Sequence, residues 1–318
     1  MKKKLMCMLL TGVMAASMLT GCGSSEEPAE NAAEADEATT DNAAETDAAE
    51  EEVASDFDTA EMIAVYSRED GSGTRGAFIE LFGIEQKDES GEKIDYTTEE
   101  AVITNSTDVM LTSVSGDTYG IGYVSLGSLN DTVKAVKIDG AEATVENIKS
   151  GAYAIARPFN IATNGEVSEV AQDFINYIMS AEGQAVITEN GYIGSDDAAA
   201  FESNGATGKV VVGGSSSVSP VMEKLIEAYK AVNTGAEIEL QTSDSTTGMT
   251  GAADGTLDIG MASRELKDSE VEAGLTATKI AMDGIAVVVN QENPVEDLPA
   301  ETVKGIFMGE ITEWDAAN

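Results

Sequence analysis

The sequence of 318 residues contains no histidine, and this absence excludes several kinds of site. Catalytic triads with a histidine base, zinc and haem sites held by imidazole, and pH switches built on histidine are all ruled out. Aromatic residues make up only 5%, with Trp314 as the single tryptophan, which disfavours a carbohydrate site built from stacked rings. Any function of this chain therefore has to work without imidazole and with few aromatic rings.

Basic residues are also scarce. The sequence holds 18 Lys and Arg against 58 Asp and Glu, a formal net charge of −40. A field of that sign repels nucleic acid and anionic lipid headgroups, so we expect no nucleic-acid partner. It does not exclude a small anion that is held in a dry local site.

Only two cysteines are present, and both lie near the start of the chain. Three lysines precede an apolar stretch at residues 5–19, and the residues Leu-Thr-Gly-Cys at 19–22 resemble a bacterial lipoprotein signal. This resemblance implies a signal peptide over 1–21, lipidation of Cys22 and an extracytoplasmic location on the cell membrane. An ordinary secretory signal with a chance cysteine is the alternative. Because Cys7 would be removed, no internal disulfide is expected.

Residues 22–61 read as an acidic, disordered tether. From Glu26 to Glu61 the segment is rich in Ala, Glu, Asp and Thr and contains no basic residue. Such a composition cannot bury enough apolar area to offset the entropy of ordering, and charge repulsion keeps it extended. We expect it to act as a spacer between the lipid anchor and the folded part.

The remaining chain alternates strand and helix patterns. Apolar runs predict strands at 62–67, 119–124, 133–138, 209–212, 238–240, 257–260 and 285–289, and amphipathic periodicity predicts helices at 75–82, 167–189 and 220–229. The segment 167–189 reads as one long helix. This alternation predicts an α/β fold with mostly parallel sheets.

Three polar turns follow predicted strands and precede predicted helices, at residues 70–74, 214–217 and 244–248. In open α/β sheets, ligands bind beyond the carboxyl ends of strands, where helix starts expose unpaired N–H groups. Small residues let the backbone approach an oxyanion, and Arg68 beside the first turn can supply a charged fork. A single turn of this kind is most often a simple helix cap, but three in one chain favour an oxyanion site.

Two catalytic motifs are missing from these turns. None is followed by the Gly-Lys-Ser/Thr of a nucleotide-binding P-loop, and no Gly-x-Ser-x-Gly elbow occurs. Without histidine, a serine nucleophile would also lack its usual base. We therefore expect no catalytic residue, metal ion or cofactor.

Four segments together resemble a known family. They are SREDGSGTR at 67–75, GGSSSVSP at 213–220, DIGMASR at 258–264 and GIGYV at 120–124. The combination resembles the phosphate-binding protein of bacterial ABC phosphate importers and extends over nearly all of residues 62–318. The resemblance implies a two-lobed, periplasmic-binding-protein-like (type II) fold that closes on a hinge. It also implies a protein that captures inorganic phosphate and delivers it to an ABC permease in the membrane.

The resemblance assigns roles to individual residues. The phosphate contacts of one lobe fall on Ser216, Ser217 and Ser245, and those of the other lobe fall on Arg68, Ser72, Gly73 and Thr74. Asp70 falls on the carboxylate that pairs with the arginine.

One position departs from the family pattern. Some members have an Asp that accepts the phosphate proton where this chain has Ser263. Asp70 is the substitute candidate for that acceptor, and an oriented hydroxyl or carbonyl is the alternative. If Asp70 accepts the proton, sulfate, which carries none, should bind more weakly than phosphate.

The order of the segments resembles a circular permutation of the family, because the later half comes first. The lobe with Ser216 and Ser245 would span 156–284, and the lobe with Arg68 would combine 62–155 with 285–318. Residues 193–208 would join the old ends, and the new ends should lie close together. We expect a monomer; a swapped dimer and a gene fragment are the alternatives.

Two other functions stay open. A binding protein for another tetrahedral oxyanion, such as sulfate, would use the same donors. An extracellular phosphate-ester hydrolase would need a nucleophile with a base or metal ligands, and the sequence shows no such combination.

Overall fold

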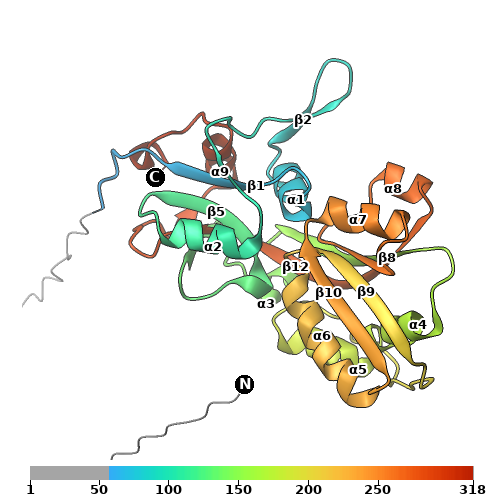
Figure 1. Ribbon diagram of the computed structural model, residues 1–318. Helices are drawn as coiled ribbons and strands as arrows, with labels where there is room; N and C mark the ends of the chain where they lie inside the picture. Colours follow the sequence, from blue (N-terminus) through green and yellow to red (C-terminus); the bar gives the residue numbers. More distant parts are fainter. Residues whose placement is uncertain (1–56, 318) are drawn as a thin grey trace, which may run out of the picture. The chain divides into compact units, whose positions relative to one another are not determined.

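The structure, a computed structural model, describes residues 57–317 (Figure 1). The predicted signal peptide 1–21, the predicted lipid site Cys22 and the predicted tether up to residue 56 lie outside the described residues. Within 57–317, no helix is both long enough and apolar enough to cross a bilayer.

Strands and helices alternate along the described chain, as the sequence predicts. The strands are β1 Ala64–Arg68, β2 Glu85–Lys87, β3 Lys93–Asp95, β4 Val102–Thr104, β5 Gly120–Ser125, β6 Lys134–Ala135, β7 Lys137–Ile138, β8 Ala156–Asn164, β9 Gly208–Ser215, β10 Ala236–Ser243, β11 Ile259–Ala262, β12 Leu275–Val289 and β13 Asp297–Leu298. The helices are α1 Gly73–Leu81, α2 Thr107–Ser115, α3 Val145–Ser150, α4 Glu169–Ile178, α5 Ala181–Glu189, α6 Ser219–Val232, α7 Ser245–Ala253, α8 Asp268–Glu272 and α9 Ala300–Phe307. Short 3-10 turns lie at Leu126–Ser128 and Trp314–Ala316.

The main sheet has the strand order β10-β9-β11-β8-β12-β5-β1-β4. Strands β10, β9 and β11 are parallel at one end, and β5, β1 and β4 are parallel at the other. Between them, β8 and β12 run antiparallel to each other and to their neighbours. The expectation of mostly parallel sheets is therefore wrong for the middle of the sheet, where the two long strands β8 and β12 pair in antiparallel direction.

Strands β8 and β12 run between the two largest hydrophobic cores of the described residues. One core is built from residues of 63–155 and 285–317, and the other from residues of 159–281. Between the cores, Ala156 pairs with Gly284 and Arg157 pairs with Asp283. The two segments that the resemblance marks as lobe crossings thus lie side by side in one ladder.

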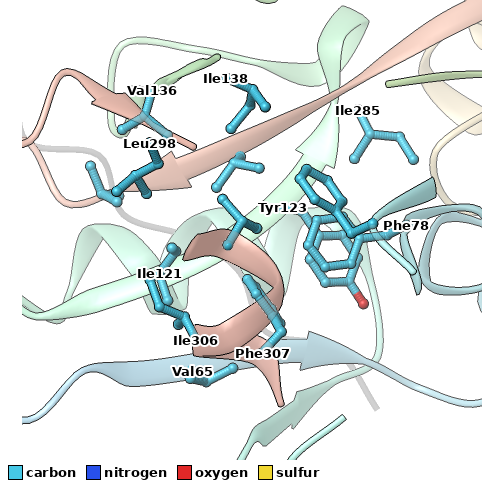
Figure 2. Packing of buried hydrophobic residues seen from close by; sticks show 14 of the residues in the cluster. Val65, Phe78, Ile121, Tyr123, Val136, Ile138, Ile285, Leu298, Ile306 and Phe307 are labelled. Carbon is cyan, nitrogen blue, oxygen red and sulfur yellow. The ribbon is translucent and has the colours of Figure 1, made fainter. Parts of the chain in front are cut away.

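Aromatic rings in the first core hold the end of β1 in place. Phe78 and Tyr123 stack with ring centroids 3.9 Å apart, and the ring of Phe307 meets Phe78 edge-on (Figure 2). The Tyr123 hydroxyl lies 2.9 Å from Ser67 Oγ and accepts a hydrogen bond from Arg68 N over 3.0 Å. Burial raises the pKa of Tyr123 to about 12, so it stays protonated near neutral pH. The core therefore fixes the backbone from which Arg68 projects.

The segment 167–189 forms two helices, so the prediction of a single long helix is wrong. Helix α4 ends at Ile178 and α5 begins at Ala181. Between them Ser180 donates from Oγ to Tyr177 O over 2.7 Å and accepts from Gly183 N over 3.2 Å. The serine caps the second helix, and the apolar periodicity continues across the break because both helices face the same core.

The predicted tether ends earlier than expected, because residues 57–61 lie on the first core. The ring centroid of Phe57 lies 4.9 Å from that of Tyr119 and 6.1 Å from that of Trp314. Asp315 N donates to Thr59 O over 2.7 Å. One aromatic residue thus supplies the apolar area that the composition of 22–61 as a whole lacks.

The two ends of the described chain lie together beside β1 (Figure 1). Met62 forms an antiparallel bridge with Glu313, and Ile63 N donates to Thr312 O over 2.8 Å. This proximity is what a permuted order requires, because a permutation cuts the chain where old neighbours stay adjacent.

The segment 193–208 is anchored along its length, including near both of its ends. Ile193 forms a bridge with Met282. Near its other end, Asp173 of α4 accepts 2.8 Å hydrogen bonds from Ser203 Oγ and Asn204 N. Tyr229 also donates to the same carboxylate over 2.8 Å. The carboxylate therefore ties this long connection to both α4 and α6.

We expect Asp173→Asn to destabilise the fold by about 1–3 kcal/mol near neutral pH, because it weakens several buried hydrogen bonds to a charged acceptor. Burial alone would raise the pKa of Asp173, but the bonds from Asn204, Tyr229 and Ser203 outweigh it, so that pKa lies below its ordinary value. A lowered pKa stabilises the fold above the unfolded value of about 4, and this contribution is lost as the pH falls through the folded value.

Urea unfolding at pH 7 and at pH 3 measures this difference. The gap in unfolding free energy between wild type and Asp173→Asn should shrink at the lower pH. The exposed Glu223→Gln on α6 is the control and should change little at either pH. A gap that stays constant or grows on acidification would contradict this account.

Candidate anion-binding site

Strand ends and helix starts from both cores meet at one place. Strands β9, β10 and β11 are parallel, so their carboxyl ends lie at the same edge of the sheet. From there the chain enters α6 and α7, while β1 leads into α1 and β4 into α2. Each of these helices presents unpaired N–H groups and a partial positive charge at its start. The position suits an anion.

Seven hydroxyl side chains form a buried group here, which we call the hydroxyl cluster. Its members are Thr74, Thr107, Ser215, Ser216, Ser217, Ser245 and Ser263, and none is more than 7% exposed. Thr74 Oγ1 lies 2.8 Å from Ser217 Oγ and 3.3 Å from Ser263 Oγ. Ser215 Oγ donates to Ser263 Oγ over 3.0 Å. The threonines come from the side of the first core and the serines from the side of the second, so the cluster bridges the two.

Arg68 is the charged group that touches the cluster most directly. It is 2% exposed, and its Nη2 donates to Ser216 Oγ over 3.1 Å. It also forms a two-pronged ion pair with Glu69, in which the Nε–Oε2 and Nη2–Oε1 distances are both 2.7 Å. The fork is thereby held with one edge on a carboxylate and one nitrogen in the cluster.

The structure corrects the role expected for Asp70. Its side chain is 97% exposed, and it pairs with Arg75 across 2.9 Å and not with Arg68. The neighbouring Glu69 takes the place beside Arg68. Asp70 therefore neither pairs with the arginine nor faces the cluster, which removes the ground for treating it as a proton acceptor.

Gly73 and Ser72 occupy different places in the same turn. A Cβ added to Gly73 would lie 2.4 Å from Ser245 Oγ and 2.7 Å from Ser263 Oγ, so this backbone passes directly against the cluster. Ser72 Oγ accepts from Arg75 N over 3.2 Å and caps α1. Its hydroxyl thus serves the helix, while Gly73 brings the backbone to the site.

Of the residues predicted for the site, the structure brings together Arg68, Gly73, Thr74, Ser216, Ser217, Ser245 and Ser263. Among them, Ser245 Oγ accepts from Ser263 N over 3.1 Å. Asp70 lies outside the site, and Ser72 lies at its edge as a helix cap.

Sequence reasoning missed three residues at the site. Thr107 Oγ1 lies 3.3 Å from Ser217 Oγ and 3.4 Å from Ser216 Oγ. Ser215 bonds Ser263, and Arg157 donates from Nη2 to Thr74 Oγ1 over 3.1 Å. Thr107 carried a usable signal, because it follows a strand and Ser106, the N-cap of α2, in the same pattern as the other polar turns.

Within residues 57–317, Cys, Asp and Glu side chains form no group of three or more that could hold a metal ion. The groups at the site are hydroxyl and backbone N–H donors together with guanidinium nitrogens of Arg68 and Arg157, and burial largely excludes water from them. These groups match the oxygens of a tetrahedral anion.

Comparisons with known proteins agree with this geometry. The PBP superfamily domain matches residues 35–182 and 199–318. The chain is 59% identical over 253 residues to phosphate-binding protein PstS 2 of Streptococcus agalactiae, covering 79% of this chain and 86% of the relative. The chain belongs to the PstS family.

A further curated relative and a solved structure also match over most of their length. Phosphate-binding protein PstS 2 of Streptococcus pneumoniae is 46% identical over 254 residues, 80% of this chain and 87% of the relative. The crystal structure of a phosphate ABC transporter phosphate-binding protein from Streptococcus pneumoniae has 45% identity and a TM-score of 0.64. It covers 81% of this chain and 100% of that chain.

These PstS relatives also bear on the segment order. An alignment of 253 residues that covers 86% of the relative includes both halves of the folded part, one after the other. The two halves therefore follow each other in the same order in that protein. The order of the two halves is therefore not peculiar to this sequence.

Proposed function

We propose that this protein captures inorganic phosphate at the hydroxyl cluster and delivers it to an ABC importer in the membrane. The observation that carries the proposal is the cluster itself, in which seven buried hydroxyls from the sides of both cores gather and Arg68 donates from Nη2 to Ser216 Oγ. The family membership supports the same reading, since the Streptococcus agalactiae relative is named a phosphate-binding protein and the solved structure is that of a phosphate ABC transporter phosphate-binding protein.

Each part of the site has a role in this proposal. Arg68 supplies a charged donor, and Gly73 lets the backbone approach the anion closely. Hydroxyls from Thr74 on one side and Ser217 on the other now bond each other over 2.8 Å. A phosphate ion between them would replace these mutual bonds with charge-assisted ones, which are stronger.

The capture is proposed to work by closure of two lobes. One lobe combines 62–155 with 285–318, and the other spans 156–284, with a hinge where β8 and β12 cross. The two separate hydrophobic cores support this division, because each lobe can move without breaking its own core. With ligand donors on both sides, binding draws the lobes together.

The function is proposed to be binding without catalysis. The serines of the cluster bond hydroxyls, guanidinium groups and backbone N–H groups, and these are not general bases for a serine nucleophile. Release of phosphate from a generic phosphate ester, assayed with the purified protein, tests this part. Turnover that is lost in Ser217→Ala would favour the hydrolase alternative.

The location is proposed to be outside the cytoplasm, with a lipid on Cys22 that holds the protein on the membrane. The residues Leu-Thr-Gly-Cys at 19–22 support this, as does the likeness to the solved phosphate ABC transporter phosphate-binding protein. Partition of the native protein into a detergent phase, compared with Cys22→Ala, tests it. Equal partition of the two forms would contradict the proposed lipid anchor on Cys22.

Isothermal titration of the purified protein with phosphate and with sulfate tests the central proposal. We expect one phosphate per chain and a monomeric protein by light scattering at several concentrations. Absence of phosphate binding would overturn the proposal, and tighter binding of sulfate would identify the alternative tetrahedral anion. A doubled mass that depends on concentration would indicate a swapped dimer.

We expect Asp70→Asn to leave phosphate affinity and the ratio of phosphate to sulfate affinity unchanged within about twofold. The exposed carboxylate pairs with Arg75 at the surface, and exposed pairs contribute little. Titration of both anions into the variant measures this. A smaller difference between the phosphate and sulfate affinities of the variant would show that Asp70 does take part in binding.

A further inference from the structure

Arg157 lies in the middle of the crossing between the lobes and touches the site from there. It is the second residue of β8 and is 3% exposed. Its Nη1 makes a short ion pair with Asp283 Oδ2 and donates to Gly284 O over 2.7 Å, both on the neighbouring strand β12. Its Nη2 donates to Thr74 Oγ1 over 3.1 Å. One guanidinium therefore joins the crossing strands to a hydroxyl of the anion site.

The Arg157–Asp283 pair is itself firmly held. Asp283 accepts from Ser125 Oγ over 2.7 Å and from Gly127 N over 3.2 Å, and its side chain is fully buried. The ring of Phe159 lies 5.1 Å from the Arg157 guanidinium carbon. Because Asp283 balances its charge, Arg157 adds little net positive charge to the site. Its contribution has to come from geometry.

The geometry determines which way the Thr74 hydroxyl points. A guanidinium can only donate hydrogen bonds, so Thr74 Oγ1 must be the acceptor in its bond with Arg157. A hydroxyl has a single proton, and with Arg157 on one lone pair that proton is directed to another partner. Ser217 Oγ at 2.8 Å and Ser263 Oγ at 3.3 Å are those partners here. An anion placed between the lobes would receive the same proton.

We propose that Arg157 is a positioning residue of the phosphate site, which turns the Thr74 hydroxyl into a donor toward the anion. The proposal rests on the proposed function of phosphate capture. It adds a link that the motif residues do not contain, because Arg157 and Asp283 belong to the strands that join the lobes. A change in the alignment of these strands would alter the Thr74 donor as well.

A double-mutant cycle on phosphate affinity tests the proposal, with the full chain and inorganic phosphate in a calorimeter. Arg157→Lys keeps a cation beside Asp283, but a lysine lacks the fork needed to hold Asp283 and Thr74 together. We expect it to weaken binding about 3- to 10-fold, the loss of one oriented hydrogen bond. Thr74→Val should weaken binding about 10-fold or more, since it removes a donor to a charged ligand.

The decisive variant combines the two substitutions. If Arg157 acts through Thr74, adding Arg157→Lys to Thr74→Val should cost less than about twofold further, because the hydroxyl that it orients is already gone. Losses that multiply would overturn the positioning role, and so would unchanged affinity in Arg157→Lys alone. Thermal unfolding of each variant shows whether Arg157→Lys also lowers stability. A loss of affinity caused only by lower stability would be equally large in the wild-type and Thr74→Val backgrounds.

Two further variants complete the design. Asp283→Asn keeps Arg157 but weakens the ion pair that holds it, so this variant replaces Arg157→Lys if the latter does not fold. Its effect on phosphate affinity should likewise disappear when it is combined with Thr74→Val. Arg264→Lys is the matched control, because its guanidinium pairs with Glu270 and donates to Thr246, outside the cluster. Wild-type protein that binds no phosphate would overturn the proposed function, whereas normal binding with multiplied losses would overturn only the role of Arg157.

Discussion

Replacement of Gly73 by alanine is expected to weaken phosphate binding at least about 100-fold. The new Cβ would lie 2.4 Å from Ser245 Oγ and 2.7 Å from Ser263 Oγ, so both hydroxyls would have to leave their positions. Each hydrogen bond to a charged ligand contributes about 1.5–3 kcal/mol, and two would be lost together. Titration with phosphate measures the effect.

Gly76→Ala provides the matched control for this prediction. It lies in the same helix, and its added Cβ would have Arg264 Cδ at 3.9 Å as its nearest contact, an ordinary distance. Alanine should be neutral for binding there and slightly stabilising for the helix. Similar affinities for the two variants would mean that the backbone at Gly73 does not approach the ligand.

Arg68→Ala is expected to weaken phosphate binding about 10- to 150-fold, as the loss of a charge-assisted bond of about 1.5–3 kcal/mol requires. The upper end is expected, because the variant also leaves Glu69 without its partner beside an anion site. Arg68→Lys should recover only part of the loss, since an ammonium cannot bond Glu69 and Ser216 with the same fork.

Arg264→Ala is the control for the change in net charge. Its guanidinium is close to Ser263 in sequence but is engaged by Glu270 and Thr246. If the field of the whole protein decided affinity, Arg264→Ala would weaken binding as much as Arg68→Ala. Equal losses of phosphate affinity in the two variants, or unchanged affinity in Arg68→Ala, would show that Arg68 does not contact the anion.

The residues of the site could largely be predicted from the sequence, because strand, polar turn and helix start follow one another locally. The parallel strands β9, β10 and β11 then bring the residues that follow them, among them Ser216, Ser245 and Ser263, to one edge without further information. Thr107 obeys the same local rule and was predictable in principle. Arg157 was not, since its contact with Thr74 depends on how two distant strands cross.

The exchange of Asp70 for Glu69 shows where sequence reasoning stops. The two carboxylates are neighbours, and both can reach an arginine nearby. Which of them turns inward depends on the backbone of the turn and on Arg75, which holds Asp70 outside. Spacing alone carries no information on such a choice, because the side chains differ by one methylene and one position.

Some predicted boundaries of helices and strands were wrong for a related reason. The break at Ser180 leaves the apolar face of 167–189 uninterrupted, so periodicity alone does not reveal it. Strand β12 was predicted only at its apolar end, 285–289, and extends back to Leu275. Its first half exposes Thr276, Ala277 and Lys279, so that part lacks the continuous apolar run of a covered strand.

Both ends of the described chain belong to the same core, and this has a practical consequence for measuring motion. Phe57 and Trp314 pack together, while residues of 159–281 form the second core, to which the chain passes along β8 and β12. A probe attached near either end of the described chain is therefore held on the first core, and in the proposed closure the lobe 156–284 moves relative to it. The proposed closure would leave the distance between dyes at Phe57 and Trp314 unchanged, whereas it would change the distance between a dye near Phe57 and one on the exposed Val232 of α6.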